Sequence, residues 1–287
     1  MKEINRREFL KTLGASAAAA TGTASLVGCM PNQDGSVDAI DPAGTETSPI
    51  ATDKMEYRSF ESLGNDKVSL LGYGCMRWPM IPNPNGEGEI IDQEQVNKLV
   101  DYAIEHGVNY FDTAPVYCQG QSEAATGIAL SRHPRSSYYV ATKMSTQNPS
   151  KWSMEKSDIE FSKNMYYNSF KYLQVDYIDY LLMHIVGTGG YEHFMSRFVE
   201  NGMMDFLIKE RENGKIRHLG WSFHGDIKVF DYLLQLQDEG KVKWDFVQIQ
   251  HNYIDWKLAK GFNTPAEYLY GELAKRNIPV VVMEPLL

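Results

Sequence analysis

Seven short apolar segments recur along the chain, and a stretch with a helical pattern separates each from the next. The segments span residues 70–75, 108–112, 138–143, 177–184, 218–223, 246–251 and 279–284. Most of them are apolar on both faces, which is typical of strands buried in a parallel sheet. The alternation of strands and helices therefore predicts an α/β fold built around such a sheet.

Helical patterns fill the intervals, and several have recognisable first residues. Asp92 and Asp226 each precede an apolar stripe at helical spacing, so both are predicted to cap helices. Thr264, followed at once by proline, is predicted to cap another. We expect Ser157 to open a further helix and interpret residues 122–133 as helical. A hairpin is predicted between residues 55–60 and the segment that follows the turn at residues 64–66.

Two architectures of this class compete, a doubly wound open sheet and a (β/α)8 barrel. A dinucleotide-binding open sheet would carry GxGxxG after its first strand, but this strand ends in GYGCMR, without a third glycine or an immediate helix. The pattern therefore favours a (β/α)8 TIM-type barrel. Because the sequence stops at Leu287, directly after the seventh strand, we expect the eighth strand and helix to be missing and the wall to have open edges. We interpret the chain as a fragment of a longer protein.

The N-terminus resembles an export signal and is not expected to belong to the fold. Arg6-Arg7 followed by EFLK resembles a twin-arginine signal, and an Ala-rich stretch follows it. Leu26-Val27-Gly28-Cys29 resembles a lipobox, the site where a bacterial lipoprotein is cleaved and its cysteine acylated. We therefore predict a signal at 1–29, lipidation of Cys29, a flexible tether at 30–54 and the barrel at 55–287. The predicted location is periplasmic, with a lipid anchor in the membrane.

Charge and hydropathy exclude two classes of partner. The formal net charge is −9 at pH 7, so the chain offers no basic field for nucleic acid. The sequence contains no uninterrupted run of eighteen apolar residues, so no membrane-spanning helix is predicted. If Cys29 carries lipid, only Cys75 and Cys118 remain, which is too few for a disulfide framework. The state of oligomerisation is not predicted.

Polar side chains gather where the predicted strands end. Active residues of a barrel lie at the C-terminal ends of its strands. These ends carry Cys75, Arg77, Asp112, Lys143, His184, Ser222, His224, Gln248, His251, Met283 and Glu284. An acid, a base and a histidine thus come from three adjacent strands, and Tyr117 lies on the loop after the first of these three.

Asp112, Tyr117, Lys143 and His184, in this order, resemble the tetrad of the aldo/keto reductase family. The strings FDTAPVY with GQSE, VATK, LLMH, HLGWSFH and VQIQHNY support the resemblance, which runs from about residue 57 to the end. It implies NADPH or NADH as cofactor, lying across the barrel mouth, and a small-molecule carbonyl substrate.

The same resemblance assigns the cofactor contacts. It implies that Ser222 and Gln248 hold the nicotinamide carboxamide. Met283 stands where the family usually has a tyrosine that stacks on the nicotinamide, and Phe223 where it usually has an asparagine. A thioether can still contact a ring face, with less area than a tyrosine. Trp78 and Cys118 are expected to line the substrate pocket.

The chemistry explains why these residue types belong together. Hydride addition to a carbonyl leaves an alkoxide that needs a proton, and a tyrosine with a pKa of about 10 is a weak donor. The Lys143 ammonium would lower that pKa, and Asp112 would hold the lysine charged and in place. His184 would hydrogen-bond the substrate oxygen. We therefore predict an NAD(P)H-dependent oxidoreductase that reduces an aldehyde or ketone, or oxidises the alcohol, with Tyr117 as general acid/base.

Two other interpretations stay open at this point. Free nicotinamide cofactor is scarce outside the cytoplasm, so the chain could be a non-catalytic aldo/keto reductase-like protein of the envelope that binds a ligand or acts as a scaffold. The cysteines and histidines at the predicted mouth also invite a metal site. The sequence contains no close ligand pair such as CxxC or HxxxH there, so no metal is expected.

Overall fold

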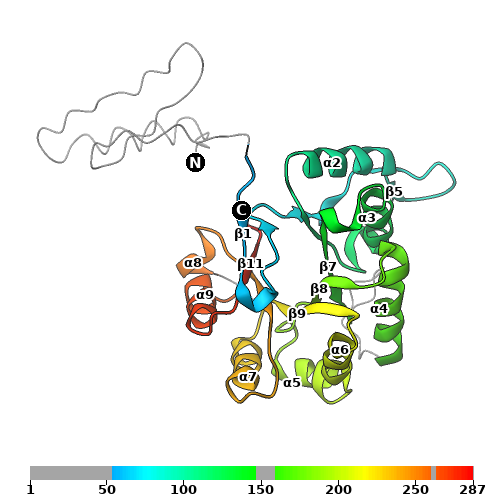
Figure 1. Ribbon diagram of the computed structural model, residues 1–287. Coiled ribbons are helices and arrows are strands. Elements are labelled where there is room, and N and C mark those ends of the chain that lie inside the picture. The colour runs from blue at the N-terminus through cyan, green and yellow to red at the C-terminus, as the bar shows by residue number, and fades with distance from the viewer. Residues whose placement is uncertain (1–53, 147–158, 260–262, 287) are drawn as a thin grey trace, which may run out of the picture. The chain divides into compact units, whose positions relative to one another are not determined.

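A single parallel sheet organises the computed structural model, which describes residues 54–146, 159–259 and 263–286. The sheet order is β3-β6-β7-β8-β9-β10-β11, and every pairing between neighbours is parallel. The strands are β3 (Tyr73–Gly74), β6 (Tyr110–Asp112), β7 (Tyr139–Met144), β8 (Ile178–Met183), β9 (Ile216–Phe223), β10 (Phe246–Gln250) and β11 (Val280–Met283). The sheet curls as a TIM-type barrel that lacks a strand would, which confirms the predicted α/β class (Figure 1).

Helices connect the successive strands and lie along the outside of the sheet (Figure 1). They are α2 (Gln93–Glu105), α3 (Ser122–Leu130), α4 (Ile159–Leu173), α5 (Tyr191–Phe194), α6 (Met203–Glu212), α7 (Ile227–Asp238), α8 (Asp255–Leu258) and α9 (Ala266–Lys275). Shorter turns of helix are η2 (Glu61–Leu63), η3 (Cys75–Arg77), η4 (Tyr117–Gly120), η5 (Arg135–Ser137) and the π-helical η6 (Met195–Val199).

Two of the predicted helix caps are confirmed and one is wrong. The carboxylates of Asp92 and Asp226 accept hydrogen bonds of 3.0 Å from backbone N–H groups in the first turns of α2 and α7. Helix α9 begins after Pro265, and its cap makes no side-chain hydrogen bond. The hydroxyl of Thr264 instead donates to the backbone oxygen of Gly225, 3.4 Å away, so it is engaged with a neighbouring loop. Ser157, Cys29 and residues 30–53 of the predicted tether lie outside the described residues.

The beginning of the barrel differs from the prediction in two places. The hairpin of β1 (Tyr57–Arg58) and β2 (Val68–Ser69) is confirmed, but the first barrel strand is reduced to β3. Leu70 and Leu71 are exposed. The backbone N–H of Leu70 donates to the backbone oxygen of Glu56, next to β1, so this part of the chain continues the hairpin and does not enter the barrel sheet. A second hairpin, β4 (Met80–Pro82) with β5 (Glu89–Ile91), lies in a stretch where no strand was predicted.

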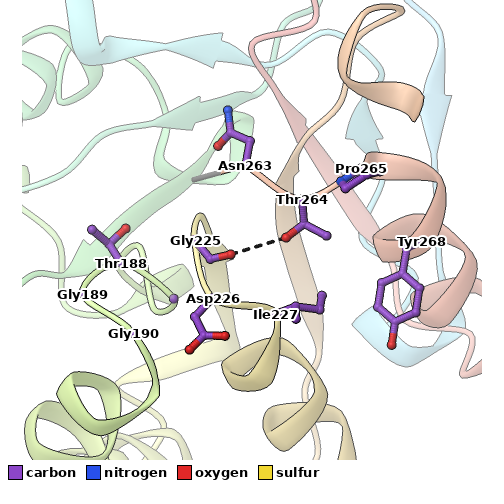
Figure 2. A pocket seen from close by; sticks show the side chains of 11 residues that line it. Thr188, Gly189, Gly190, Gly225, Asp226, Ile227, Asn263, Thr264, Pro265 and Tyr268 are labelled. Carbon is purple, nitrogen blue, oxygen red and sulfur yellow. Dashed lines mark hydrogen bonds between the residues drawn. The ribbon is translucent and has the colours of Figure 1, made fainter. Parts of the chain in front are cut away.

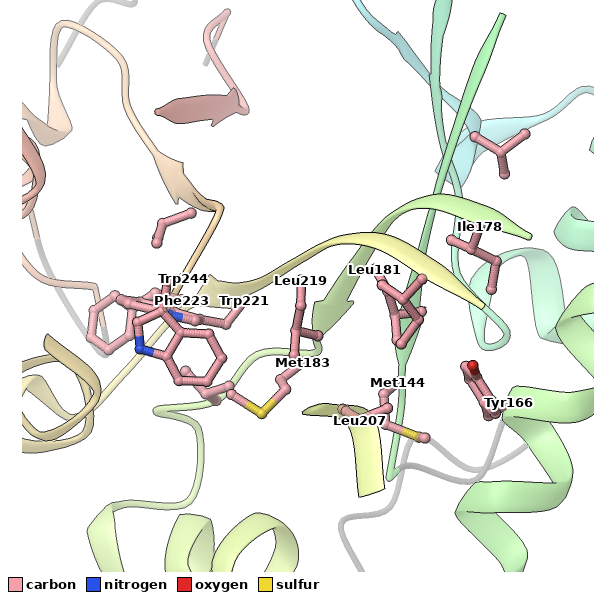
Figure 3. Packing of buried hydrophobic residues seen from close by; sticks show 14 of the residues in the cluster. Met144, Tyr166, Ile178, Leu181, Met183, Leu207, Leu219, Trp221, Phe223 and Trp244 are labelled. Carbon is pink, nitrogen blue, oxygen red and sulfur yellow. The ribbon is translucent and has the colours of Figure 1, made fainter. Parts of the chain in front are cut away.

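Side-chain alternation divides the core into two layers, because successive strand residues point to opposite faces of the sheet. The larger layer packs between the sheet and the helices and includes Leu181, Leu219 and Trp221 (Figure 3). A smaller layer includes Ala141, Leu182 and Phe246. Two residues beyond each of these three, on the same face, come Lys143, His184 and Gln248. The inner apolar layer therefore sets the direction in which the predicted site residues point.

Candidate active site

Asp112 and Lys143 form a buried ion pair at the ends of β6 and β7. Lys143 Nζ lies 2.6 Å from Asp112 Oδ1 and also donates to the backbone oxygen of Thr113 at 2.7 Å. Only 2% of Lys143 is exposed. Burial alone would lower its pKa, but Asp112 and Tyr117 together outweigh burial and hold the pKa of Lys143 above its ordinary value. The lysine is therefore a permanent positive charge at the inner face.

Tyr117 lies against this ion pair, on the turn η4. Its ring centroid is 4.6 Å from Lys143 Nζ and 5.9 Å from the ring of His184. The turn is made by Cys118 and Gln119, which both have a left-handed backbone with φ of 49° and 57°. Burial raises the pKa of Tyr117 and the charge of Lys143 opposes that rise. The lysine acts in the predicted direction, but burial outweighs it.

His184 is buried and hydrogen-bonded at the end of β8. Its Nδ1 lies 2.5 Å from the Ser145 hydroxyl oxygen, and its backbone N–H donates to Met144 at the end of β7. Burial, followed by the positive charge of Lys143, lowers the pKa of His184 well below its ordinary value. The ring is therefore an uncharged imidazole.

Ser222 and Gln248 are paired in register on β9 and β10, and both are buried. The Ser222 hydroxyl oxygen accepts the backbone N–H of Ile185 at 2.9 Å, and its own hydrogen has no acceptor among residues 54–146, 159–259 and 263–286. Gln248 Nε2 donates to the second oxygen of Asp112, 3.2 Å away. Its Oε1 accepts no hydrogen bond from the described residues. The half-buried Met283 ends β11 on the same inner face.

The two residues expected to line a substrate pocket differ in their exposure and in their partners. Cys118 is half-buried beside Tyr117, and its thiol donates to the backbone oxygen of Met76 at 3.3 Å. Trp78 is only 3% exposed, because its indole N–H donates to Thr126 on α3 and its ring stacks on Tyr73. Trp78 thus packs in the core and leaves little surface for a substrate.

Several supporting residues were missed by sequence reasoning. The Ser122 hydroxyl lies 2.8 Å from Thr113 Oγ1 and donates to the backbone oxygen of Cys75, so the first turn of α3 is fixed to the ends of β3 and β6. Glu123 accepts from the Thr142 hydroxyl at 2.5 Å, and burial raises its pKa to about 7. Both residues stand in the GQSE string, which was the available signal, but the string alone names no partner.

A separate cavity of about 660 Å³ lies between the loops after β8 and β9 and the start of α9 (Figure 2). Its lining includes Thr188, Asp226, Asn263 and Thr264. None of the predicted site residues lines it. The Asp226 carboxylate is occupied by the backbone N–H groups of Lys228 and Tyr191, so this cavity offers no unengaged charge from that residue.

Within residues 54–146, 159–259 and 263–286, no three His, Cys, Asp or Glu side chains are grouped so as to hold a metal ion. Over the same ranges, no helix has both the length and the apolar character needed to cross a membrane.

Comparison with known proteins gives two family matches. Residues 71–287 match the model described as "Aldo/keto reductase family", and residues 3–23 match that of the twin-arginine translocation pathway signal sequence. The second match indicates export by the twin-arginine route.

Two relatives of known name match the chain over about two-thirds of its length. L-galactose dehydrogenase of Arabidopsis thaliana is 29% identical over 66% of this chain and 54% of its own length. NADH-specific methylglyoxal reductase of Escherichia coli is 30% identical over 67% of this chain and 59% of its own length. The chain thus spans little more than half the length of these relatives.

Solved structures agree on the fold. An aldo-keto reductase of Bacillus halodurans in its holo form has a TM-score of 0.58 at 24% identity, over 79% of this chain and 65% of that one. An aldo-keto reductase of Bombyx mori in complex with NADP has a TM-score of 0.55 at 20% identity, over 80% and 66% of the two chains. At these identities the likeness shows the fold alone.

Proposed function

Because its residues 71–287 place this chain in the aldo/keto reductase family, we propose that it is an NAD(P)H-dependent oxidoreductase that reduces an aldehyde or ketone and catalyses the reverse oxidation. The observation that carries the proposal is the Asp112–Lys143 ion pair with the Tyr117 ring 4.6 Å from the ammonium. A buried lysine paired in this way stabilises negative charge on a phenol beside it.

In this mechanism Tyr117 donates its proton to the carbonyl oxygen as that oxygen becomes an alkoxide. Lys143 limits the cost of the phenolate that remains, and Asp112 holds Lys143 charged. A positioned acid of this kind contributes typically about 10²–10⁴-fold in rate. In the reverse reaction the Tyr117 phenolate removes the proton from the alcohol.

His184 completes the site by directing the substrate oxygen. A carbonyl oxygen needs a hydrogen-bond donor, so the ring must carry its hydrogen on Nε2. This tautomer requires Nδ1 to accept the Ser145 hydroxyl hydrogen, and the 2.5 Å contact satisfies that requirement. An uncharged, oriented imidazole donates without competing with Tyr117 for the role of acid.

The inner face also fits a nicotinamide cofactor. A carboxamide has one carbonyl acceptor and one NH₂ donor, and the hydroxyl hydrogen of Ser222 and Oε1 of Gln248 supply the complementary pair. Met283 would contact the ring face. When bound, the nicotinamide supplies the hydride. NADPH and NADH are both proposed, because one relative is named as NADH-specific and one similar structure holds NADP.

The location follows from the N-terminus. Export by the twin-arginine route carries folded proteins, and we propose that the product is periplasmic and anchored through a lipid on Cys29. The match to the signal ends at residue 23, six residues before this cysteine. Such an anchor would place the small-molecule reaction beside a membrane.

The test compares the protein with its Tyr117→Phe variant on a panel of aldehydes and ketones, with NADPH and NADH in turn. We expect the variant to lose at least about 10²-fold in kcat while its cofactor Kd, measured by cofactor fluorescence, stays unchanged. Equal turnover by the two proteins would refute the role of Tyr117. Cofactor binding without turnover of any carbonyl by the unaltered protein would instead favour a non-catalytic binding protein.

A further inference from the structure

Arg197 is a buried guanidinium close to the candidate active site. It belongs to the π-helical turn η6 and is only 1% exposed. Its Nη1 donates to Thr146 Oγ1 at 2.7 Å, and its Nη2 lies 3.3 Å and 3.5 Å from the backbone oxygens of Thr188 and Val186. Single π-helical turns are frequent at functional sites.

The residues that Arg197 contacts flank the hydrogen bond between Ser145 and His184 along the chain. Thr146 follows Ser145 directly, and Val186 comes two residues after His184. One planar guanidinium therefore joins the segment that leaves β7 to the segment that leaves β8. Between these two attachment points lies the 2.5 Å contact that sets the orientation of the imidazole.

The charges around the imidazole act in one direction. Lys143 on β7, His224 after β9 and Arg197 on η6 act on His184 through their charges, and the Tyr117 ring on η4 lies against its ring. Burial lowers the pKa of His184 first, and Lys143, His224 and Arg197 each lower it further. Lys143 also supports Tyr117, the proposed acid, whereas Arg197 does not. Removing Arg197 therefore changes the pKa of His184 and leaves the Asp112–Lys143–Tyr117 group in place.

We propose that Arg197 is a positioning residue for His184, because it fixes the backbone on both sides of the Ser145–His184 hydrogen bond. Its contacts described above are with Thr146 and with the backbone oxygens of Val186 and Thr188, so its proposed action on the reaction runs through His184. The inference uses the proposed function only for the consequence, namely that His184 directs the carbonyl oxygen. The orientation and charge of His184 can be measured without any turnover.

The direct experiment is NMR of protein labelled with ¹⁵N-histidine, in which the His184→Asn variant assigns the signal. In the unaltered protein we expect one neutral tautomer, with the hydrogen on Nε2, from about pH 5 to pH 8. In Arg197→Met we expect a second tautomer and a His184 pKa higher than in the unaltered protein. Arg197→Lys keeps the positive charge but loses the planar guanidinium with its paired N–H donors. We therefore expect a second tautomer of His184 without protonation of its ring.

Arg211→Met is the matched control. Arg211 also ties two segments together, through the backbone oxygen of Lys243 at 2.6 Å and the carboxylate of Asp245 at 3.1 Å, but near the starts of β9 and β10. Its loss should leave the His184 signal unchanged. If folded Arg197→Met keeps the single tautomer and the titration of the unaltered protein, the proposal is wrong. If Arg197→Met does not fold, a wild-type signal in Arg197→Lys refutes it and a mixed tautomer supports it.

Kinetics then separate this inference from the proposed function. With a carbonyl substrate, Arg197→Met should lose about 10²-fold in kcat, because small displacements of a directing group have effects of that size, while the KM for the cofactor is unchanged. If the unaltered protein turns over no carbonyl, the proposed function fails. The NMR result still decides whether Arg197 positions His184.

Discussion

Replacing Glu123 by glutamine should stabilise the fold at alkaline pH and leave it nearly unchanged at acid pH. Glu123 lies on α3, is 2% exposed, and accepts the Thr142 hydroxyl at 2.5 Å. Burial raises its pKa from 4.5 to about 7. A carboxyl whose pKa is higher in the folded than in the unfolded state binds more protons when folded. Stability is therefore lost as pH rises from about 4.5 through about 7, and the loss is complete above that.

The magnitude follows from the same interval. A rise of the Glu123 pKa from 4.5 to about 7, at about 1.4 kcal/mol for each pKa unit, corresponds to about 3 kcal/mol of unfolding free energy. Glutamine keeps the oxygen that accepts from Thr142 and removes the charge. Urea unfolding of both proteins at about pH 5, pH 7 and pH 8.5 should show a difference that grows from near zero to about 3 kcal/mol in favour of the variant.

A matched control makes the test specific. Glu94 on α2 is exposed and pairs with Lys98 at 2.7 Å, so Glu94→Gln should change stability by less than about 1 kcal/mol at every pH. If the curves of the unaltered protein and Glu123→Gln run parallel across the range, Glu123 is ionised in the fold at little cost. The assignment of a proton to this carboxyl near neutrality would then be wrong.

Three further outcomes are expected. Asp112→Asn leaves the buried Lys143 without its counter-ion and should cost about 3–5 kcal/mol in denaturant unfolding, and a cost under about 1 kcal/mol would contradict a buried ion pair. Gly127→Ala should destabilise the fold by about 1–3 kcal/mol, because a Cβ there would lie 2.1 Å from a backbone oxygen of α4. As a control, a Cβ at Gly271 in α9 would meet nothing within 4 Å, so Gly271→Ala should stabilise by about 0.5–1 kcal/mol. Equal shifts of the melting temperature in the two variants would refute the close packing of α3 on α4 at Gly127. Cys29→Ser should move the exported protein from the detergent phase to the aqueous phase in a phase-partition assay, and detergent partition by the variant would exclude the proposed lipid.

The strands of the barrel sheet could be predicted from the sequence, for a physical reason. Buried parallel strands must be apolar on both faces, so seven of them were visible as short runs, and alternation then placed Lys143, His184 and Gln248 on one face. The β4–β5 hairpin was not visible, because its stretch is rich in proline, glycine and asparagine. Local composition of that kind is shared by hairpins and loops.

Partner residues were harder, because a hydrogen bond across the chain leaves no local pattern. Ser145 meets His184 across 39 positions, and Arg197 meets Thr146 across 51. A serine or threonine at a strand end is too common to signal either contact. The contact of Trp78 with Thr126 on α3 was missed for the same reason, since the two residues lie 48 positions apart.

The charges of the site also predict how carbonyl reduction depends on pH. Reduction needs Tyr117 protonated and His184 uncharged. Burial keeps the pKa of Tyr117 above its ordinary value, and burial with Lys143 keeps that of His184 well below its own. Lys143 stays charged because Asp112 raises its pKa. None of the three groups changes state near neutrality.

It follows that kcat/KM for reduction should be flat between about pH 6 and pH 9, measured with a carbonyl that does not itself titrate. Oxidation of the alcohol should instead accelerate as pH rises, because Tyr117 must then be the base. A fall in reduction towards pH 6 that persists in Glu123→Gln would mean that His184 becomes charged, and the uncharged imidazole would have to be abandoned. The same fall abolished by Glu123→Gln would trace it to the buried carboxyl behind β7, which shares the strand with Lys143 through Thr142.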